Sequence, residues 1–254
     1  MIINHNINAQ MAHRYMGFNT NNAGKSMEKL STGMRINRAG DDAAGLSISE
    51  KMRSQIRGLE QAQRNAQDGI SMVQTFEGAL NEVSDMLGRM KELNVQKSNG
   101  TYQTADTGNI DLELTELATA INNIFDKTKF NGIDMQTSDV TIAMGPNGDD
   151  TVVIKAITKP NVAANDDLTT IEANIESLNS IRSQYGAYQN RLEHMVNNMG
   201  ATQENLTAAE SRIRDTDMAK EMMTFTKNNI LQQAAQAMLA QANQAPQGVL
   251  QLLR

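Results

Sequence analysis

The chain has 254 residues, of which 4% are aromatic, three are proline, and none is cysteine or tryptophan. The absence of cysteine excludes disulfides, thiolate catalysis and thiolate metal sites, and a formal charge of −6 argues against nucleic acid as the main partner. Few aromatic residues combined with many alanine, glutamine and methionine residues favour long helices packed side by side.

The N-terminal segment carries no formal charge between Met1 and Arg14 when its two histidines are neutral. Its several asparagines interrupt any continuous apolar core, so we expect no cleaved secretory signal. Because chain ends are usually solvated by charge, an uncharged end predicts a surface that is covered by protein. The apolar side chains expected at this interface are Ile2, Ile3, Ile7 and Met11.

Glycines interrupt helical periodicity between residues 30 and 49, at Gly33, Gly40 and Gly45. The same stretch carries charges that can bridge neighbouring segments, which favours a linker with helix caps. The adjacent carboxylates Asp41 and Asp42 precede a helical run, so capping of its free backbone N–H groups is favoured over metal binding. The residues expected to make linker contacts are Arg35, Asn37, Arg38, Asp41 and Asp42.

Two helices are predicted next. Apolar residues from Met52 to Met90 recur every three or four positions, which predicts a helix of roughly 45–55 residues that spans about 70–80 Å and ends at Asn99-Gly100. A second seam with the same spacing runs from Ile110 to Ile124 and stops at Asn131-Gly132.

The period then changes to two. Val140, Ile142 and Met144 alternate with polar or small residues, a turn-rich stretch follows, and alternation resumes to Ala156, which predicts a β-hairpin near residues 140–157. The last long helix is predicted from Leu168 to Ile213. A single helix of this length cannot bury its apolar stripe alone, so we expect the earlier helices to pack against it as antiparallel partners.

The C-terminal segment carries no charge from Asn228 to Leu253. Its glutamines rule out a membrane span, because their amides would be unsatisfied in hydrocarbon. We therefore expect this end to pack on the N-terminal segment or on copies of itself. The apolar residues expected at that interface are Leu239, Val249, Leu250 and Leu253.

The sequence offers no catalytic, cofactor-binding or metal-ligating set, and we expect no enzymatic activity. His-Glu-x-x-His spacing, a phosphate-binding glycine-rich loop and Gly-x-Ser-x-Gly are all absent. The residues thus predict a mainly α protein: a long antiparallel helical coiled coil or bundle with one small β-hairpin region. The heptads alone would also permit a cytoplasmic coiled-coil adaptor.

The stretch from Leu30 to Ser49, LSTGMRINRAGDDAAGLSIS, resembles the N-terminal segment of bacterial flagellins. The resemblance continues through residues 52–59, 65–71, 77–80 and 129–132. It resumes in residues 189–192 and 205–217 and in the Val249–Arg254 ending, and so covers nearly the whole chain.

The resemblance implies a structural subunit of the bacterial flagellar filament, which serves swimming motility. Residues 1–44 and 215–254 would form a terminal helical core in the inner layer, and residues 45–214 an outer layer. The short Pro160–Leu168 connection leaves no room for further outer domains, which implies a minimal flagellin.

The family also implies where the chain works and what it meets. Flagellins leave the cell unfolded through the flagellar type III export channel, without a cleaved signal, and become extracellular. The implied partners are copies of the chain itself, an export chaperone at the C-terminal region, and the filament cap and junction proteins. Neither nucleic acid nor membrane is expected.

An animal Toll-like receptor binds some flagellins through an Arg and a Leu that match Arg89 and Leu93. This sequence departs from the pattern nearby, with Gly88, Ala120 and Asn123 where amide or charged residues are usual. Fewer polar contacts predict weaker recognition. The alternative is that Arg89 and Leu93 are assembly contacts only.

The sequence is also compatible in part with three other functions. An adaptor explains neither the charge-free ends nor the Leu30–Ser49 segment, and an enzyme displayed on a filament would need an inserted domain. A hook–filament junction protein shares the terminal motifs, but the closeness of the match favours the filament subunit.

Overall fold

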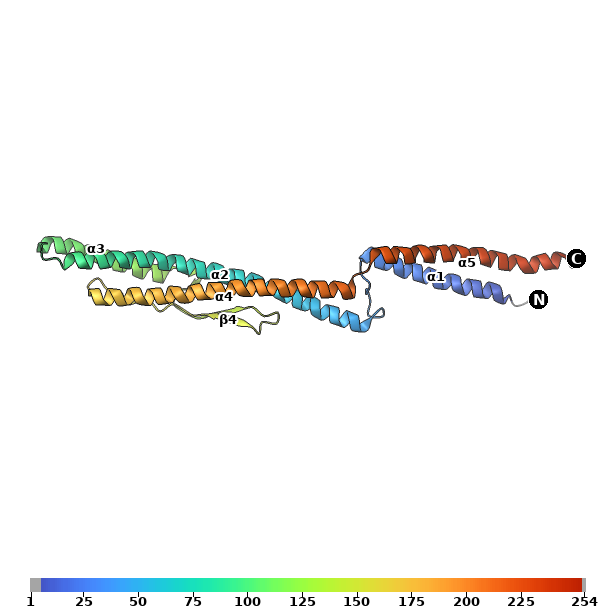
Figure 1. Ribbon diagram of the computed structural model, residues 1–254, viewed down its shortest axis with the longest axis horizontal. Helices are drawn as coiled ribbons and strands as arrows, with labels where there is room; N and C mark the ends of the chain where they lie inside the picture. Colours follow the sequence, from blue (N-terminus) through green and yellow to red (C-terminus); the bar gives the residue numbers. More distant parts are fainter. Residues whose placement is uncertain (1–5, 253–254) are drawn as a thin grey trace. The chain divides into compact units, whose positions relative to one another are not determined.

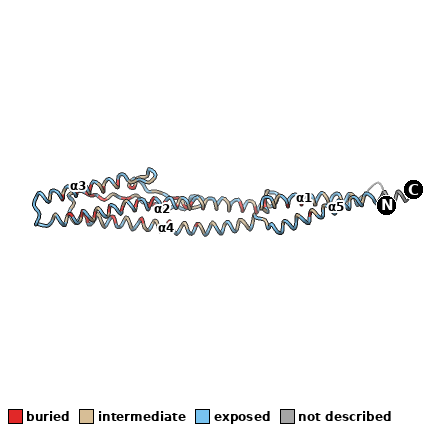
Figure 2. Tube along the Cα trace, turned by 90° about the horizontal axis from the view of Figure 1, so that it is seen from above, coloured by how far each residue is buried: buried red, intermediate tan, exposed pale blue. Residues whose placement is uncertain are grey.

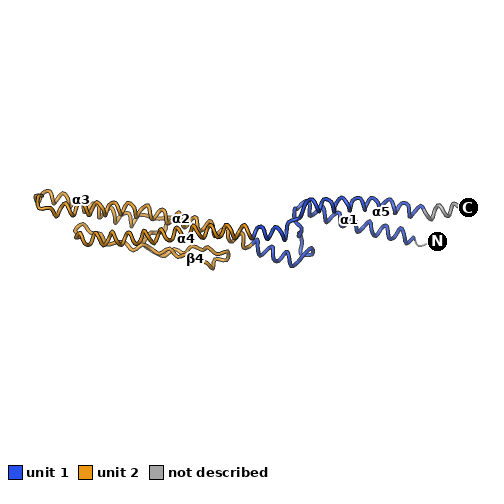
Figure 3. Tube along the Cα trace, viewed as in Figure 1, with its two compact units in different colours: residues 1–53, 206–254 blue, residues 54–205 orange. Residues whose placement is uncertain are grey.

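The computed structural model describes residues 6–252, and the side chains of residues 6–244. Helices dominate this part of the chain, with two small β-hairpins between the third and fourth helices (Figure 1). The chain divides into two compact units (Figure 3). One contains the described residues up to Arg53 and those from Leu206 onward, and the other is Ser54–Asn205. The sequence placed the division at 44/45 and 214/215, and its correspondence to filament layers stays a prediction.

The first unit is built on two antiparallel helices, α1 (Ile7–Thr32) and α5 (Met218–Leu252). The side-chain amide of Asn6 donates to the carbonyl oxygen of Ala242 at 2.7 Å, and at the other end Met34 pairs with Asp215 in a β-bridge. Helix α1 ends at Gly33, whose φ of 70° suits a residue without Cβ. The expected pairing of the two charge-poor ends is therefore confirmed for the described residues.

The long helices of the sequence prediction are present as α2 (Ala43–Lys97), α3 (Thr104–Lys127) and α4 (Leu168–Arg214). Helix α2 has 55 residues and begins where the carboxylate of Asp42 accepts from the backbone N–H of Gly45 at 2.8 Å. The predicted capping is thus confirmed for Asp42, whereas the prediction is wrong for Asp41, whose carboxylate accepts from the backbone N–H groups of Asn37 and Arg38 in the preceding turn.

Helices α2 and α4 run antiparallel within the second unit. Three contacts show this, because the residue numbers rise along α2 while those of the partners fall along α4. They join Glu60 to Gln203, Phe76 to Tyr185, and Lys91 to Glu172. Helix α3 folds back on α2 in the same way. The predicted antiparallel partnership is confirmed.

The core lies almost wholly in the second unit, where buried segments concentrate on α2, α3 and α4 (Figure 2). Its fully buried large side chains include Phe76, Leu80, Leu87, Met90, Leu114, Ile121 and Phe125. The buried Tyr185 hydroxyl donates to the carbonyl oxygen of Lys155 at 2.9 Å, and burial raises the pKa of this tyrosine. That bond connects α4 to the segment that directly follows residues 151–154.

The predicted hairpin is formed by β3 (Val140–Ala143) and β4 (Thr151–Ile154), with Val140 opposite Ile154. A second hairpin, which the sequence did not predict, joins β1 (Lys129–Phe130) to β2 (Ile133–Asp134). Its turn is Asn131-Gly132, with φ angles of 48° and 81°, as a two-residue hairpin turn requires. The sequence pattern predicted only that the preceding helical seam stops at this pair.

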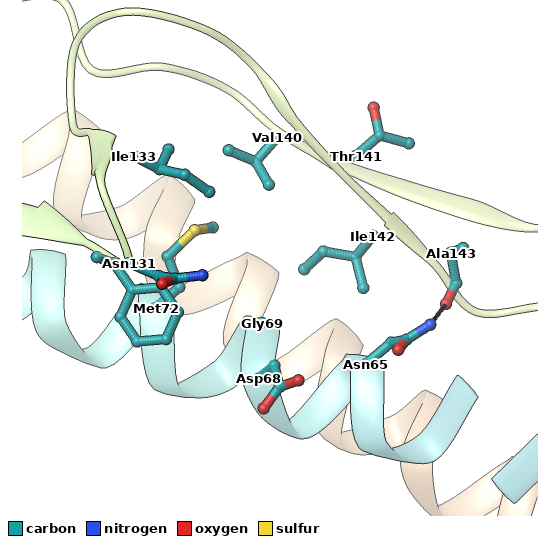
Figure 4. Close-up of a pocket in the computed structure, with 11 residues that line it drawn as sticks. Asn65, Asp68, Gly69, Met72, Asn131, Ile133, Val140, Thr141, Ile142 and Ala143 are labelled. Atoms are coloured by element: carbon teal, nitrogen blue, oxygen red, sulfur yellow. Dashed lines mark hydrogen bonds between the residues drawn. The ribbon is translucent and has the colours of Figure 1, made fainter. Parts of the chain in front are cut away.

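The β3–β4 hairpin packs closely against α2 at two glycines, which have no Cβ to obstruct it. A Cβ at Gly58 would lie 2.4 Å from the backbone oxygen of Pro146 in the hairpin turn, and a Cβ at Gly69 would collide with the side chain of Ile142. Nearby, the side-chain amide of Asn65 donates to the carbonyl oxygen of Ala143 at 3.0 Å. A groove of about 320 Å³ remains between α2 and the two hairpins (Figure 4).

Candidate assembly interface

The seam between α1 and α5 is made mostly of small or polar residues. On α1 the less exposed positions follow a heptad spacing, which places alanine, asparagine and serine against the partner helix. These positions are Ala9, Ala12, Met16, Asn19, Ala23, Ser26 and Leu30. Only Ala23 and Ser26 among them are fully buried.

The seam on α5 that faces α1 is also made mostly of small or polar residues. Its less exposed positions are also spaced four and three residues apart and include Glu221, Phe225, Asn228, Gln232, Ala235, Leu239 and Ala242, of which only Phe225 and Leu239 are large and apolar. Small side chains let two helices approach closely, but they bury little apolar area. The pair is therefore held together weakly for its length.

Most of the described large apolar side chains of α1 and α5 are instead exposed, and only Met16, Leu30, Phe225 and Leu239 among them lie at less exposed positions of the seam. Each of the exposed residues is 41% to 67% exposed in the single chain. They are Ile7, Met11, Tyr15, Phe18 and Met27 on α1, and Met218, Met222, Met223, Ile230, Leu231 and Met238 on α5. We call these residues the outward apolar set.

The outward apolar set reverses the usual burial pattern of a helix pair, in which large apolar residues face the partner. Fully burying such a side chain stabilises by about 1.5–3 kcal/mol, so covering the half that is still exposed contributes on the order of 1 kcal/mol each. An exposed apolar surface of this extent marks a protein contact. Along one side of the pair it borders a groove of about 470 Å³ lined by Met11, Tyr15 and Met238.

Three of the interface residues predicted from the sequence lie among the described side chains. Ile7 and Met11 belong to the outward apolar set, whereas Leu239 is half-buried on the α5 seam. Ile2, Ile3 and Leu253 lie outside the described residues, as do the side chains of Val249 and Leu250.

Sequence reasoning missed most of the outward apolar set. A signal was present on α1, because Ile7, Met11, Tyr15 and Phe18 are spaced four, four and three residues apart. That spacing places all four on one helical face.

The linker residues predicted from the sequence meet in the turn between α1 and α2. The Asp41 carboxylate accepts from the backbone N–H groups of Asn37 and Arg38 at 3.2 and 3.0 Å, and these bonds lower the pKa of Asp41. Arg35 donates from Nε to the carbonyl oxygen of Ile213 at 3.1 Å and lies 3.8 Å from Asp42. The turn is thereby fixed against the end of α4.

Two further ion pairs hold the same turn. Arg38 pairs with Glu28 of α1 at 3.0 Å. Arg214 at the end of α4 pairs with Glu50 of α2 at 2.6 Å, and this contact is the main reason that the pKa of Glu50 is lowered. No local sequence pattern predicts the second pair, because its members are 164 residues apart. A role of these linker residues between filament layers or between subunits stays a prediction.

The two expected receptor residues differ in exposure. Leu93 is buried in the second unit. Arg89 is half exposed and is held by Glu113 at 3.0 Å and Glu92 at 3.1 Å, and these carboxylates raise its pKa. Burial of Leu93 counts against its direct contact with a receptor, and recognition through Arg89 stays a prediction.

The described residues hold no group of three His, Asp or Glu side chains placed to bind a metal ion. Within the same range, no helix is both long and apolar enough to cross a membrane. Because it exposes large apolar side chains, the outward apolar set is a candidate contact surface for a protein partner.

Known proteins are similar in sequence to this chain along its whole length. The family model described as the bacterial flagellin N-terminal helical region matches residues 3–138, and the bacterial flagellin C-terminal helical region matches residues 168–253. The chain belongs to the bacterial flagellin family. Its function is accordingly that of a structural subunit of the flagellar filament, as the resemblance implied.

Individual relatives agree with this assignment. The flagellin of Halalkalibacterium halodurans is 52% identical, and the flagellar filament 33 kDa core protein of Treponema phagedenis is 46% identical. Each match covers 100% of both chains. A crystal structure of Bacillus cereus flagellin is 31% identical, covering 58% of this chain and 94% of that one at a TM-score of 0.49.

Proposed function

We propose that this flagellin joins the filament by burying its outward apolar set against α1 and α5 of neighbouring copies. The observation that carries this proposal is the reversed burial pattern, with mostly small or polar residues on the seam and most of the large apolar residues exposed. A single chain leaves that surface in water, and copies of the same surface can cover it. Contacts that do not close into a ring then extend as a helix.

Order in the terminal helices is coupled to this assembly. A seam of alanine and polar residues buries little apolar area, whereas fixing each residue's backbone costs about 1–2 kcal/mol. In the free subunit the pair is therefore only marginally stable, and contact with neighbours supplies the missing stabilisation. Glutamine and asparagine keep the uncharged ends soluble until then.

The remaining steps of the proposal rest on family membership. The chain leaves the cell through the flagellar type III export channel without a cleaved signal, with a chaperone bound at its C-terminal region. It then meets the filament cap and junction proteins and serves swimming motility. It performs no catalysis. The linker residues around Arg35 and Asp41 bridge the inner and outer layers.

Replacing Phe18 with aspartate tests the assembly surface. Phe18 is exposed on α1, so its removal should leave the single chain folded. In a polymer the new carboxylate would be buried without a partner, which is strongly destabilising. We expect the Phe18→Asp chain to keep wild-type helicity but to form no polymer that sediments after a precipitating salt is added.

The matched control is Phe18→Leu, which keeps an apolar side chain of good helix propensity. This variant should form long polymers visible by electron microscopy. Polymer yields that are equal for the aspartate and leucine variants would show that α1 is not an assembly surface.

A further inference from the structure

The most buried and the most exposed methionines lie in different units, whereas methionines of intermediate exposure occur in both. Among the described side chains, the methionines that are less than 6% exposed all lie in the second unit. Those that are at least 44% exposed all lie on α1 or α5 and belong to the outward apolar set. We call the second group the exposed methionines: Met11, Met27, Met218, Met222, Met223 and Met238.

The exposed methionines lie at both ends of the described helix pair. Met11 and Met238 line the same groove between α1 and α5. Toward the other end, the register set by the Asn6–Ala242 and Met34–Asp215 contacts brings Met27 level with Met222. Modification of these thioethers would therefore reach both ends of the helix pair.

From this division we propose that the exposed methionines are oxidation sites whose modification prevents the subunit from polymerising. This inference rests on the proposed function. A two-electron oxidant such as hydrogen peroxide transfers one oxygen to the thioether: an S–O bond forms, the O–O bond breaks, and water leaves. Sulfur is oxidised by two electrons while the peroxide is reduced. The product is a polar sulfoxide.

The sulfoxide opposes assembly because polymerisation would bury its oxygen in a contact made by apolar side chains. Methionine adapts to irregular apolar surfaces, and its sulfoxide does not. The second unit is less affected, because the thioethers of its core methionines such as Met72, Met90 and Met199 are shielded from solvent, and Met86 and Met195 are only partly exposed. Oxidation should thus remove assembly without unfolding the long-helix unit.

Assembly in turn should protect the same side chains. Once neighbouring copies cover α1 and α5, peroxide reaches the exposed methionines only through the free fraction of subunits or at polymer ends. The vulnerable period is therefore the time between synthesis and addition to the filament.

The test uses the purified full-length chain, treated with hydrogen peroxide either before or after polymerisation is induced with a precipitating salt. Peptide mass spectrometry locates the sulfoxides, and sedimentation gives the critical concentration for polymerisation. We expect sulfoxides first on the exposed methionines, a critical concentration raised at least tenfold, and unchanged helicity. In polymer treated after assembly, their oxidation should be at least tenfold slower.

Two matched variants assign the effect. Replacing all the exposed methionines with leucine removes the reactive sulfur but keeps the apolar surface, so this chain should polymerise normally after peroxide treatment. Replacing the buried Met72 and Met199 with leucine should leave the wild-type sensitivity unchanged.

The outcomes separate this inference from the proposed function. If the untreated chain does not polymerise, the proposed function fails. If the untreated chain polymerises and the chain with sulfoxides on the exposed methionines polymerises equally well, the oxidation inference is overturned. It is also overturned if the leucine variant remains as sensitive to peroxide as the wild type.

Discussion

Replacement of Gly58 by alanine should separate the hairpin from α2. The added Cβ would lie 2.4 Å from the carbonyl oxygen of Pro146 and 2.9 Å from its Cα, and neither is a flexible side-chain end. The clash can therefore be relieved only if the hairpin turn or the helix moves. Overpacking of this kind costs about 1–3 kcal/mol.

The same substitution at Gly78 is the matched control. Gly78 lies on α2 as well, and a Cβ there meets nothing within 4 Å. Alanine is favoured over glycine inside a helix by about 0.5–1 kcal/mol, so Gly78→Ala should stabilise the chain by that amount. Because this gain applies equally at Gly58, the difference between the two variants isolates the clash with Pro146.

Gly69 provides an intermediate case. A Cβ there would meet the terminal methyl of Ile142, which can rotate away. We expect the free energy of unfolding, measured by guanidinium titration of the full chain, to fall in the order Gly78→Ala, Gly69→Ala, Gly58→Ala. If Gly58→Ala stabilises the chain as much as Gly78→Ala, the hairpin does not pack on α2 at this point.

Two other predictions concern single contacts, and a third concerns the C-terminal segment. Tyr185→Phe leaves the carbonyl oxygen of Lys155 without its buried donor and should lower the free energy of unfolding by about 1–2 kcal/mol. An unchanged value by guanidinium titration would contradict a structural role for this bond. The pKa of Asp41 is lowered, so the stabilisation of its turn is present above pH 3.8 and is lost as pH falls through the lower folded-state pKa. The amide proton shifts of Asn37 and Arg38 should therefore titrate with a midpoint below 3.8, and a midpoint at or above that value would contradict the two hydrogen bonds. Deleting residues 228–254 should abolish polymerisation while circular dichroism shows that the second unit stays folded. Normal filaments from this truncated chain would refute assembly through the terminal helices.

The sequence predicted α2, α3 and α4 because each carries its own apolar seam over many turns, whereas the terminal helices were implied only by the family resemblance. Helix α2 was expected to have roughly 45–55 residues and has 55. The β3–β4 hairpin was predicted as well, because alternation on both sides of a glycine-rich turn is a local signal. The β1–β2 hairpin was missed because strands of two residues are too short to show a period.

The assembly surface could be predicted only in part. The absence of charge at both ends showed that these segments need cover, but it did not show which helical face. That choice depends on the register of α1 against α5, which contacts such as Asn6 with Ala242 set across 236 residues. Small residues such as Ala12 and Ala235 occupy the seam, and most of the larger apolar residues of the two helices remain exposed.

The remaining contacts are products of tertiary structure. No local sequence pattern indicates that Gly58 packs against the backbone of Pro146, or that Arg214 forms an ion pair with Glu50. Both depend on how helices far apart in the sequence pack together. In contrast, the capping role of Asp42 was predictable, because its partner Gly45 is three residues away.

A cryo-electron microscopy map of polymer grown from the purified chain is the most direct test of assembly through the outward apolar set. We predict that Ile7, Phe18 and Ile230, which are exposed in the single chain, will be buried against α1 and α5 of neighbouring copies. A map in which neighbours touch only through residues 54–205, with these three side chains still in solvent, would contradict it.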